Sequence, residues 1–313
     1  MFILRGALQL EKNHKWLVDV SVATVWTSHD SPREIDQNAI SHPVRVEEWL
    51  NGLTYETSLE LCNKNLVQTQ VLYGEEVQVI EEKGNWAHVT VPRQSSSKDS
   101  RGYPGWMPKD QLILRDDWAI NKNPVAVISE KKAVLYSNYQ KSQIELSYQT
   151  ILPFKRRDEN WVQVQTPAGE GLLRAEDIRI YDSIDQIPKG GGIDIVSAGE
   201  QFLNLPYLWG GMSSFGYDCS GFSYSMCKAN GYIIPRDAHD QAQAGKEIAL
   251  TEMEPGDLMF FAYEEGKGSI HHVGIYYGED KLIHSPNTGK CIEIIELQDT
   301  IYEKELCAAR RFW

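Results

Sequence analysis

The chain has 313 residues, of which 31 are basic and 44 acidic, so its formal net charge is −13. Nucleic acids and anionic membranes both attract basic protein faces, and this excess of acidic residues argues against either as a partner. The length suffices for two or three domains with apolar cores of their own, and no apolar run approaches the roughly 20 residues that span a bilayer.

The N-terminal residues and the cysteines bear on where the protein works. Residues 1–10 contain neither the basic n-region nor the apolar stretch and small-residue cleavage site of a signal peptide. Five cysteines spread over the chain do not make a disulfide framework and suit a reducing compartment. We therefore expect a cytoplasmic protein, the alternative being a secreted or wall-bound one whose signal peptide was removed.

Two segments in the first half of the chain repeat one pattern of short alternating strands. In both, a strand opens with an Asn-Trp pair, Asn85-Trp86 and then Asn160-Trp161. A glycine followed by an apolar residue precedes the last turn of each segment, at Gly105-Trp106 and Gly171-Leu172. This pattern predicts a small barrel of five to six strands in each copy.

The first copy is enlarged by residues 41–50 and 60–65, which have helical spacing inside what is otherwise a barrel loop. Loops longer than about 12–15 residues are usually functional, and the alternative is a decorated surface loop. After the second copy, Pro188 and three glycines mark a linker. We divide the chain into an enlarged first module (1–115), a second module (116–182), a linker (183–192) and a C-terminal domain (193–313).

A thiol in the setting of a nucleophile opens a predicted helix of the C-terminal domain. Asp218 can cap this helix through its carboxylate, and Asn230-Gly231 provides its C-terminal stop. Cys219 therefore lies in the first turn, where exposed N–H groups and the helix dipole favour the thiolate. We expect the pKa of this thiol to fall below the free value of about 8.5.

Two histidines follow on a predicted hairpin. Residues 272–277 and 281–285 predict two strands joined by a loop at Gly278–Asp280. This register puts His284 on the same face as His272 and diagonal to it, at roughly 7–8 Å between backbones. A thiol becomes a useful nucleophile when a base takes its proton and a third group orients the base, so the pattern indicates His272 as base and His284 as orienting residue.

Other interpretations of these residues are weaker. A zinc site made of Cys219 and the two histidines lacks the paired short ligand spacing that structural zinc prefers, and we expect neither a metal nor a cofactor. His271 points to the opposite face of its strand, and His239 is expected on a surface helix or loop. The remaining cysteines are expected to be inert small hydrophobic residues: Cys62, Cys227, Cys291 and Cys307.

A longer series of motifs surrounds these residues: Tyr207–Gly211, Asp218–Phe222, Pro235-Arg236, Pro255–Leu258, His272–Tyr276 and Ile283-His284. In order and spacing, the series over residues 193–313 resembles the NlpC/P60 cysteine peptidases, and the two repeated segments resemble bacterial SH3-like modules. The whole chain resembles the bacillus-type γ-D-glutamyl-L-diamino acid endopeptidases, which act on cell-wall peptides.

The resemblance implies two all-β SH3-like barrels followed by an α+β papain-like domain. It also implies site residues: Cys219 as nucleophile, His272 as base, His284 as orienting residue, Tyr207 near the oxyanion, and Asp218 and Ser220 lining the substrate pocket. Relatives often carry a serine after the Arg-Asp pair, where this chain has Ala238, so a hydrogen bond to substrate from that position is in doubt.

A carboxylate beside the nucleophile raises the pKa of the thiol and opposes the effect of the helix. A substrate ammonium on Asp218 would neutralise it, and the resemblance supplies such a substrate in L-Ala-γ-D-Glu-diamino acid, whose alanine amine is free. We expect Glu75 and Tyr103 of the first module to close the site behind this amine. The alternatives are that Glu75 is merely solvated and that Tyr103 fills the barrel.

The expected activity is therefore hydrolysis of the γ-D-glutamyl-L-diamino acid bond of murein peptides by a monomeric enzyme. Two alternatives stay open. The chain could be a secreted hydrolase that its two modules anchor to peptidoglycan, or a catalytically silent protein that recognises cell-wall peptides.

Overall fold

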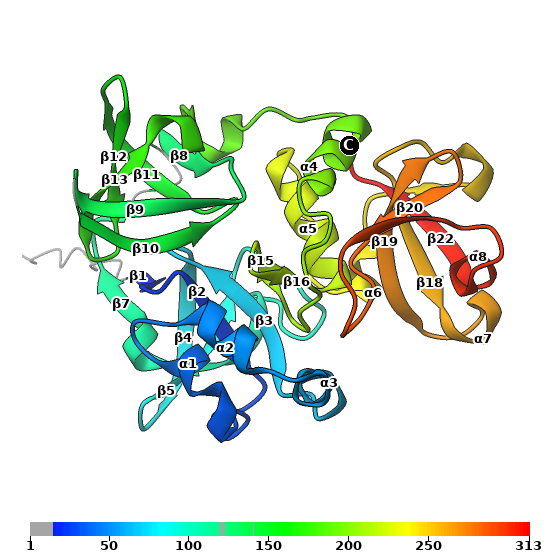
Figure 1. The fold of residues 1–313 in the computed structure, drawn as a ribbon, viewed down its shortest axis with the longest axis horizontal. Coiled ribbons are helices and arrows are strands. Elements are labelled where there is room, and N and C mark those ends of the chain that lie inside the picture. Colours follow the sequence, from blue (N-terminus) through cyan, green and yellow to red (C-terminus); the bar gives the residue numbers. More distant parts are fainter. Residues whose placement is uncertain (1–14, 119, 121–122, 140) are drawn as a thin grey trace, which may run out of the picture.

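The computed structural model describes residues 15–118, 120, 123–139 and 141–313; the N-terminal stretch considered for a signal peptide lies outside these residues. Three modules are arranged around one another, with the two sheet modules on one side and the C-terminal domain on the other (Figure 1). Each module has its own cluster of buried apolar side chains.

The first module is an antiparallel sheet in the order β3-β2-β6-β5-β4-β1-β7. Its strands are β1 (Lys15–Val18), β2 (Val22–Trp26), β3 (Val67–Leu72), β4 (Glu76–Lys83), β5 (Trp86–Val91), β6 (Tyr103–Pro108) and β7 (Leu112–Arg115). Successive side chains of a strand point to opposite faces, and the inward set forms the buried core of this module.

The second module repeats this arrangement in the order β10-β9-β13-β12-β11-β8-β14. Its strands are β8 (Val125–Ile128), β9 (Lys132–Asn138), β10 (Lys141–Ser147), β11 (Ile151–Arg157), β12 (Trp161–Thr166), β13 (Gly169–Arg174) and β14 (Ile178–Tyr181). Trp86 and Trp161 open equivalent strands, as predicted. The prediction of five to six strands is wrong, because each sheet has seven strands among the residues that the structure describes: strands before the repeated pattern, such as β1 and β8, were not recognised.

The insertion in the first module forms three helices between β2 and β3: α1 (Gln37–Ile40), α2 (Val46–Gly52) and α3 (Tyr55–Asn63). Helix α1 lies wholly before the helix predicted at 41–50. Pro43 lies between α1 and α2 and belongs to neither, because proline lacks the N–H that a helix interior needs. Thr54 caps α3 by accepting from the Thr57 N–H at 3.2 Å.

The insertion is more than a surface loop. Trp49 of α2 is 1% exposed and packs against Trp26 at 6.2 Å between ring centres. The same apolar cluster includes Leu61 of α3 and Leu208 of the C-terminal domain. The helices therefore join the first module to the domain that carries the predicted nucleophile.

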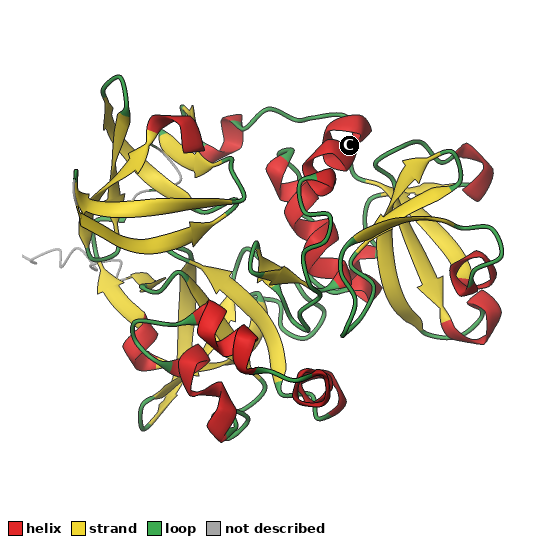
Figure 2. Cartoon of the chain, in the orientation of Figure 1, coloured by secondary structure: helices red, strands yellow, loops and turns green. Residues whose placement is uncertain are grey.

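The C-terminal domain packs helices against a sheet in the order β17-β22-β18-β19-β20-β21 (Figure 2). Its helices are α4 (Gly192–Glu200), α5 (Cys219–Ala229), α6 (Ala238–Gln241), α7 (Tyr263–Gly266) and α8 (Ile301–Glu305). Its strands are β15 (Met212–Ser213), β16 (Gly216–Tyr217), β17 (Lys246–Ile248), β18 (Leu258–Ala262), β19 (Ile270–Gly278), β20 (Lys281–His284), β21 (Glu293–Glu296) and β22 (Leu306–Arg311). Short 3-10 helices complete the fold: η1 (Glu34–Asp36), η2 (Lys109–Gln111), η3 (Ala175–Asp177), η4 (Ile184–Gln186) and η5 (Leu250–Glu252).

The core of this domain sets the position of α5. Phe222 and Met226 are fully buried one helical turn apart, and they pack in one cluster with Val273 of β19 and Ile283 of β20. Residues spaced by four lie on one helix face, so this face holds α5 against the two strands that carry the predicted histidines.

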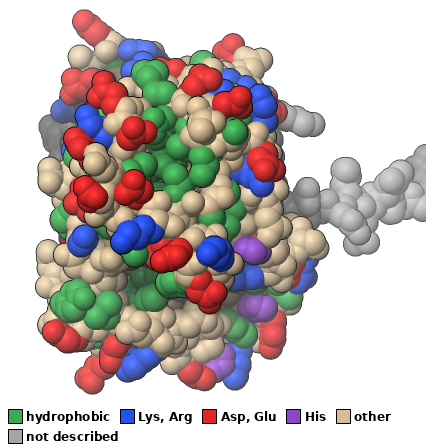
Figure 3. All heavy atoms as spheres, turned by 90° about the vertical axis from the view of Figure 1, so that its right-hand side faces the viewer, with side chains coloured by type: hydrophobic (Ala, Val, Ile, Leu, Met, Phe, Trp, Pro, Cys, Tyr) green, Lys and Arg blue, Asp and Glu red, His purple; other side chains and the backbone are tan. Residues whose placement is uncertain are grey.

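The outer face of the C-terminal domain mixes acidic and basic side chains, with apolar side chains gathered between them (Figure 3). A broad basic face of the kind that binds nucleic acid is not present on this side of the molecule. Among the residues that the structure describes, no helix is both long and apolar enough to cross a membrane.

Candidate active site

Cys219 is the first residue of α5. The carboxylate of Asp218 caps the helix by accepting from the N–H of Gly221 at 2.6 Å. At the other end, Gly231 adopts a φ of 78°, a left-handed conformation that suits glycine and ends the helix. The helix predicted around the thiol is confirmed, including both of its end signals.

The hairpin that carries the histidines has the predicted register, with Ile275 of β19 opposite Ile283 of β20. Its turn differs from the prediction. Gly278 pairs with Lys281 instead of lying in the loop, and the loop consists of Glu279 and Asp280, whose φ angles are 52° and 54°. Two consecutive residues in the left-handed backbone conformation form a tight turn whose twist matches that of the flanking strands.

The absence of a side chain at Gly274 leaves space for the two histidines to approach each other. A Cβ placed on Gly274 would come within 2.9 Å of the His284 Cβ and 2.4 Å of Leu282 Cδ1, so any side chain here would displace the neighbouring strand. His284 consequently reaches across to His272, and the ring nitrogens His272 Nε2 and His284 Nδ1 lie 2.8 Å apart. Both histidines are buried.

This contact constrains the tautomers. If His272 takes the thiol proton on Nδ1, its Nε2 carries a hydrogen and donates to Nδ1 of His284. The hydrogen of neutral His284 is then on Nε2, which is buried without a hydrogen-bond partner among the described side chains. The carboxylate of Glu293, opposite His284 on β21, lies 3.7 Å from this nitrogen. The observed chain of groups thus runs from His272 through His284 to the carboxylate of Glu293.

The electrostatics of the thiol differ from the expectation. Burial and then the carboxylate of Asp218 raise the pKa of Cys219 to about 12, and hydrogen bonding to the Val273 backbone and the charge of Arg236 only partly offset this. Burial lowers the pKa of His272 well below its ordinary value, and His284 lowers it further. The prediction of a depressed thiol pKa is wrong here, because desolvation outweighs the helix terminus.

Neither group therefore ionises alone. A proton passed from Cys219 to His272 creates a thiolate and an imidazolium together, and their opposite charges compensate each other in the buried site. The arrangement suits a reaction in which the proton moves as the sulfur attacks.

Asp218 and Ser220 are engaged within the protein. Arg236, which is 1% exposed, donates from Nη2 to Asp218 Oδ2 at 2.6 Å and from Nη1 to Asp218 Oδ1 at 3.1 Å. Its Nη1 also donates to the Ser220 hydroxyl at 2.7 Å. Asp218 was expected to receive the substrate ammonium, and this stays a prediction; in the structure Arg236 already pairs with this carboxylate.

Glu75 lies away from the thiol. Lys228 donates to Glu75 Oε1 at 2.7 Å, and both side chains are largely buried. Lys228 is in the last turn of α5, nine residues after Cys219, which corresponds to roughly 14 Å along the helix. The expectation that Glu75 closes the substrate site is therefore wrong, and the residue instead ties the first module to the far end of α5.

Tyr103 does lie at the boundary with the C-terminal domain. It is 2% exposed, and its hydroxyl donates to both carboxylate oxygens of Asp237 at 2.9 Å. Asp237 precedes α6, whose Gln241 donates to the backbone oxygen of Ser220 at 3.1 Å, so this contact lies beside the N-terminal turn of α5. The sequence predicts Tyr103 at the site but gives no local signal for its pairing with Asp237.

Tyr207 lies near Cys219, so negative charge on the sulfur disfavours ionisation of the phenol. Burial, followed by the nearby Cys219 and Asp218, raises the pKa of Tyr207 well above its ordinary value. The phenol consequently keeps its proton and can donate a hydrogen bond. This is the property that a partner for a developing oxyanion needs.

Two further residues near the histidines were missed. Tyr302 of α8 packs on both imidazoles, with ring centres 5.2 Å from His272 and 4.9 Å from His284. Glu293 faces His284 across the sheet. Alternation in the strand after His284 is the signal that could have indicated Glu293, whereas Tyr302 comes from a distant helix and has no local signal.

His271 and His239 take no part in the His272–His284 pair. His271 pairs with Glu305 at 3.0 Å and stacks on Tyr263, and His239 is exposed in α6. Within the described part of the chain, no group of three or more His, Cys, Asp or Glu side chains is arranged to hold a metal ion.

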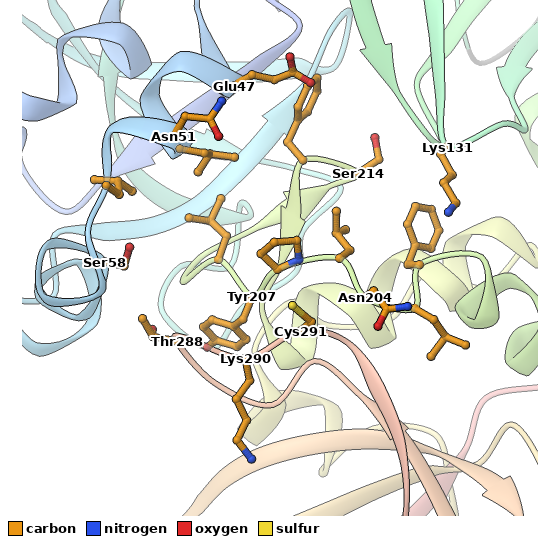
Figure 4. A pocket seen from close by; sticks show the side chains of 18 of the residues that line it. Glu47, Asn51, Ser58, Lys131, Asn204, Tyr207, Ser214, Thr288, Lys290 and Cys291 are labelled. Atoms are coloured by element: carbon orange, nitrogen blue, oxygen red, sulfur yellow. The ribbon is translucent and has the colours of Figure 1, made fainter.

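A cleft of about 1350 Å³ adjoins this region where the three modules meet (Figure 4). Glu47 and Asn51 line it from the first module, Lys131 from the second, and Tyr207 and Lys290 from the C-terminal domain. Through Tyr207 the cleft reaches the surroundings of the thiol. Its volume exceeds the roughly 300–1,000 Å³ of typical small-ligand pockets.

Comparison with known proteins agrees with this geometry. The NlpC/P60 family matches residues 204–311, the YKFC SH3b2 domain matches residues 128–181, and the bacterial dipeptidyl-peptidase Sh3 domain matches residues 64–112. These matches coincide with the C-terminal domain and with the two sheet modules.

Similar proteins extend over nearly the whole chain. A γ-D-glutamyl-L-lysine dipeptidyl-peptidase of Bacillus subtilis is 52% identical, covering 93% of this chain and 96% of its own length. A protein of the same name from Bacillus cereus is 40% identical, covering 96% of this chain and 92% of its own length. A crystal structure of an NlpC/P60 family protein from Bacillus cereus superposes with a TM-score of 0.92 at 39% identity, covering 95% of this chain and 99% of that one. The chain therefore belongs to the NlpC/P60 family of cysteine peptidases, with two bacterial SH3 modules ahead of its peptidase domain.

Proposed function

We propose that this peptidase hydrolyses the γ-D-glutamyl-L-diamino acid bond of murein peptides that carry a free N-terminal L-alanine. The observation that carries the proposal is the Cys219–His272–His284 arrangement in a chain 52% identical to a γ-D-glutamyl-L-lysine dipeptidyl-peptidase. A catalytically silent peptide-binding protein has no need of a partly buried thiol at a helix N-terminus together with a hydrogen-bonded pair of imidazoles.

The groups assigned above account for each step. The sulfur of Cys219 attacks the γ-carbonyl carbon of D-glutamate while His272 takes the thiol proton. The phenol of Tyr207 and the N–H of Cys219 stabilise the oxyanion. The carbon–nitrogen bond then breaks as the imidazolium of His272 returns the proton to the leaving α-amine of the diamino acid. Water attacks the resulting thioester, again giving a proton to His272, and the thiol is regenerated.

Asp237 is the carboxylate we assign to the free alanine amine. Arg236 neutralises Asp218 and Lys228 neutralises Glu75, both through buried contacts. Asp237 also pairs with a cation, Lys98 at 3.1 Å, but this pair is partly exposed, with Asp237 31% and Lys98 43% accessible. Asp237 lies beside the N-terminal turn of α5 with Tyr103 bound to it. A carboxylate with an oriented phenol is a suitable partner for an ammonium group.

A defined peptide series tests the substrate. We expect L-Ala-γ-D-Glu-L-Lys to yield L-Ala-D-Glu and lysine, identified by mass, and the N-acetylated peptide to be cleaved at least about tenfold less efficiently, since it cannot pair with a carboxylate. Replacing lysine by another diamino acid identifies the preferred residue. The Cys219→Ala protein is the control for contaminating peptidases. Comparable cleavage of free and acetylated peptides contradicts the proposal.

We also propose that the enzyme works as a monomer on released peptides inside the cell. The cysteine content suits a reducing compartment and supports the intracellular part of the proposal. Sedimentation of the purified protein at several concentrations should give one monomer-sized species. Cell fractionation should place the native product with soluble cytoplasmic proteins, and recovery from the medium or the wall supports a secreted hydrolase instead.

A further inference from the structure

A side chain of the protein itself occupies the position assigned to the substrate ammonium. The Nζ of Lys98 lies 3.1 Å from Asp237 Oδ2 and 3.0 Å from Gln68 Oε1, and it donates to the hydroxyl of Tyr103. It also lies 4.2 Å from the centre of the Tyr103 ring. An ammonium group has three N–H donors, and these three acceptors match them one for one.

Other hydrogen bonds orient the acceptors. The Nε2 of Gln68 donates to the Thr27 hydroxyl at 2.6 Å and to Asn65 Oδ1 at 3.0 Å, which leaves its Oε1 turned toward the ammonium. Tyr103 is buried, and its hydroxyl donates to Asp237, so the lone pairs of that hydroxyl are available to accept. The acceptors are therefore arranged for a cation independently of the lysine.

Lys98 can leave the site without disturbing the structure around it. It lies on the segment between β5 and β6, and its side chain is 43% exposed. The backbone of this segment is anchored separately: the N–H of Ser97 donates to Asp240 Oδ2 at 2.9 Å, and the carbonyl of Ser95 accepts from the Arg236 N–H at 3.0 Å. A flexible four-carbon side chain can swing out while this backbone stays in place.

We propose that Lys98 is a specificity-determining residue whose ammonium holds the free-amine site until the substrate's own ammonium displaces it. The proposal rests on the proposed function of Asp237. One set of three acceptors cannot serve two ammonium groups at once, so the two compete. A substrate with a blocked amine breaks the lysine's ion pair and forms none in return, which adds to the preference for a free amine.

Substrate can bind only the molecules in which the lysine has left the site. The apparent affinity is therefore the intrinsic affinity multiplied by the fraction of such molecules. Removing the lysine should remove this effect. For L-Ala-γ-D-Glu-L-Lys we expect Lys98→Met to lower KM by about fivefold, the factor typical of a partly exposed ion pair, with little change in kcat. Lys109→Met is the matched control, because Lys109 pairs with Glu82 on the same module outside the site. A KM equal to or above that of the wild type overturns the proposal.

A second variant separates this inference from the function on which it rests. Asp237→Asn should reduce the ratio of kcat/KM between the free and the N-acetylated peptide. If Asp237→Asn leaves that ratio unchanged, the free amine is read elsewhere, and the assigned site and the lysine competition both fail. If the ratio falls but Lys98→Met does not lower KM, only the competition is refuted.

Discussion

At the scale of single residues, the site combines a thiol and two imidazoles whose pKa values all favour the neutral forms. Burial raises the pKa of Cys219 and lowers that of His272, so the two groups can ionise only together. His284 contributes by engaging Nε2 of His272, which leaves Nδ1 of His272 as the nitrogen that can accept a proton. The three residues therefore have unequal roles, and their replacements should have unequal effects.

Cys219→Ala and His272→Ala should each abolish turnover without unfolding the protein, because one removes the nucleophile and the other the proton acceptor. His284→Ala should leave measurable residual activity, since this residue positions the base and transfers no proton to substrate. Peptide cleavage followed by mass analysis checks both, with circular dichroism confirming the fold. Near-normal turnover by purified Cys219→Ala contradicts the assigned nucleophile.

Glu293 should act as a positioning residue for His284. Its carboxylate lies 3.7 Å from the otherwise unpartnered Nε2 of His284, where it favours the imidazolium that forms during attack. We expect Glu293→Gln to lower kcat by about three- to tenfold with little change in KM, in line with a partly exposed charge pair. The acid limb of the kcat–pH profile should move to lower pH, because the imidazolium loses a stabilising charge.

The control for this variant is Glu296→Gln, which changes an exposed glutamate of the same strand that faces Lys281 instead of a histidine. If Glu293→Gln and Glu296→Gln have the same kcat and the same pH profile, Glu293 has no positioning role.

At the scale of elements, the N-terminal turn of α5 depends on a buried ion pair. Arg236 supports the carboxylate that caps the helix, binds the hydroxyl of Ser220, and reaches Thr69 of β3 at 2.9 Å. This one side chain connects the nucleophile's helix with the first module. Its loss leaves the charge of Asp218 buried without a partner.

Arg236→Met should lower the free energy of unfolding of the peptidase domain by about 3–5 kcal/mol, the usual cost of leaving one member of a buried pair uncompensated. The double variant Asp218→Asn/Arg236→Met should recover part of this loss, because it removes the orphaned charge. Urea unfolding followed by tryptophan fluorescence measures both. Arg101→Met, which breaks an exposed pair with Asp99, should change stability by less than about 1 kcal/mol; an equal effect of the two arginine variants refutes this account.

At the scale of the whole molecule, the modules are joined by buried polar contacts and by apolar ones. Gln70 of β3 accepts from the N–H of Met212 and from the hydroxyl of Ser213, both at 3.1 Å. Lys228 and Glu75 form an ion pair across the same boundary. These contacts hold the first module in place beside the active site, where Tyr103 helps to form the assigned free-amine site.

The Glu75–Lys228 pair should make the interface sensitive to acid. Burial raises the pKa of Glu75, but Lys228, the N–H of Leu72 and Arg93 together outweigh burial and leave that pKa below its ordinary value of 4.5. A carboxylate with a depressed folded pKa contributes stability that is fully present above 4.5 and is lost as the pH falls through the folded value. The stabilisation should therefore be constant near neutral pH and decline in acid.

Glu75→Gln should cost about 3–5 kcal/mol of stability at pH 7, and the difference from the wild type should shrink as the pH falls below 4.5. Thermal unfolding across this pH range measures the effect. Glu76→Gln is the neighbouring control, because Glu76 pairs with Lys15 at the surface and should contribute less than about 1 kcal/mol. A stability difference that stays constant down to pH 3 contradicts the assigned ion pair.

The local parts of the site could be predicted from the sequence, because short-range physics determines them. The cap at Asp218, the stop at Gly231 and the hairpin register at Ile275 and Ile283 all follow from neighbouring residues. The same is true of the pairing between His272 and His284, which depends on strand alternation and on the absence of a side chain at position 274.

Only the tertiary structure decided which charged side chains pair with one another inside the protein. Arg236 lies eighteen residues from Asp218, and Lys228 lies 153 residues from Glu75, so neither neutralisation leaves a local pattern in the sequence. The pKa of Cys219 likewise depends on burial by surrounding modules, which overrides the helix terminus that the sequence does reveal. Long-range packing selects partners and removes water, and both effects depend on how the three modules meet.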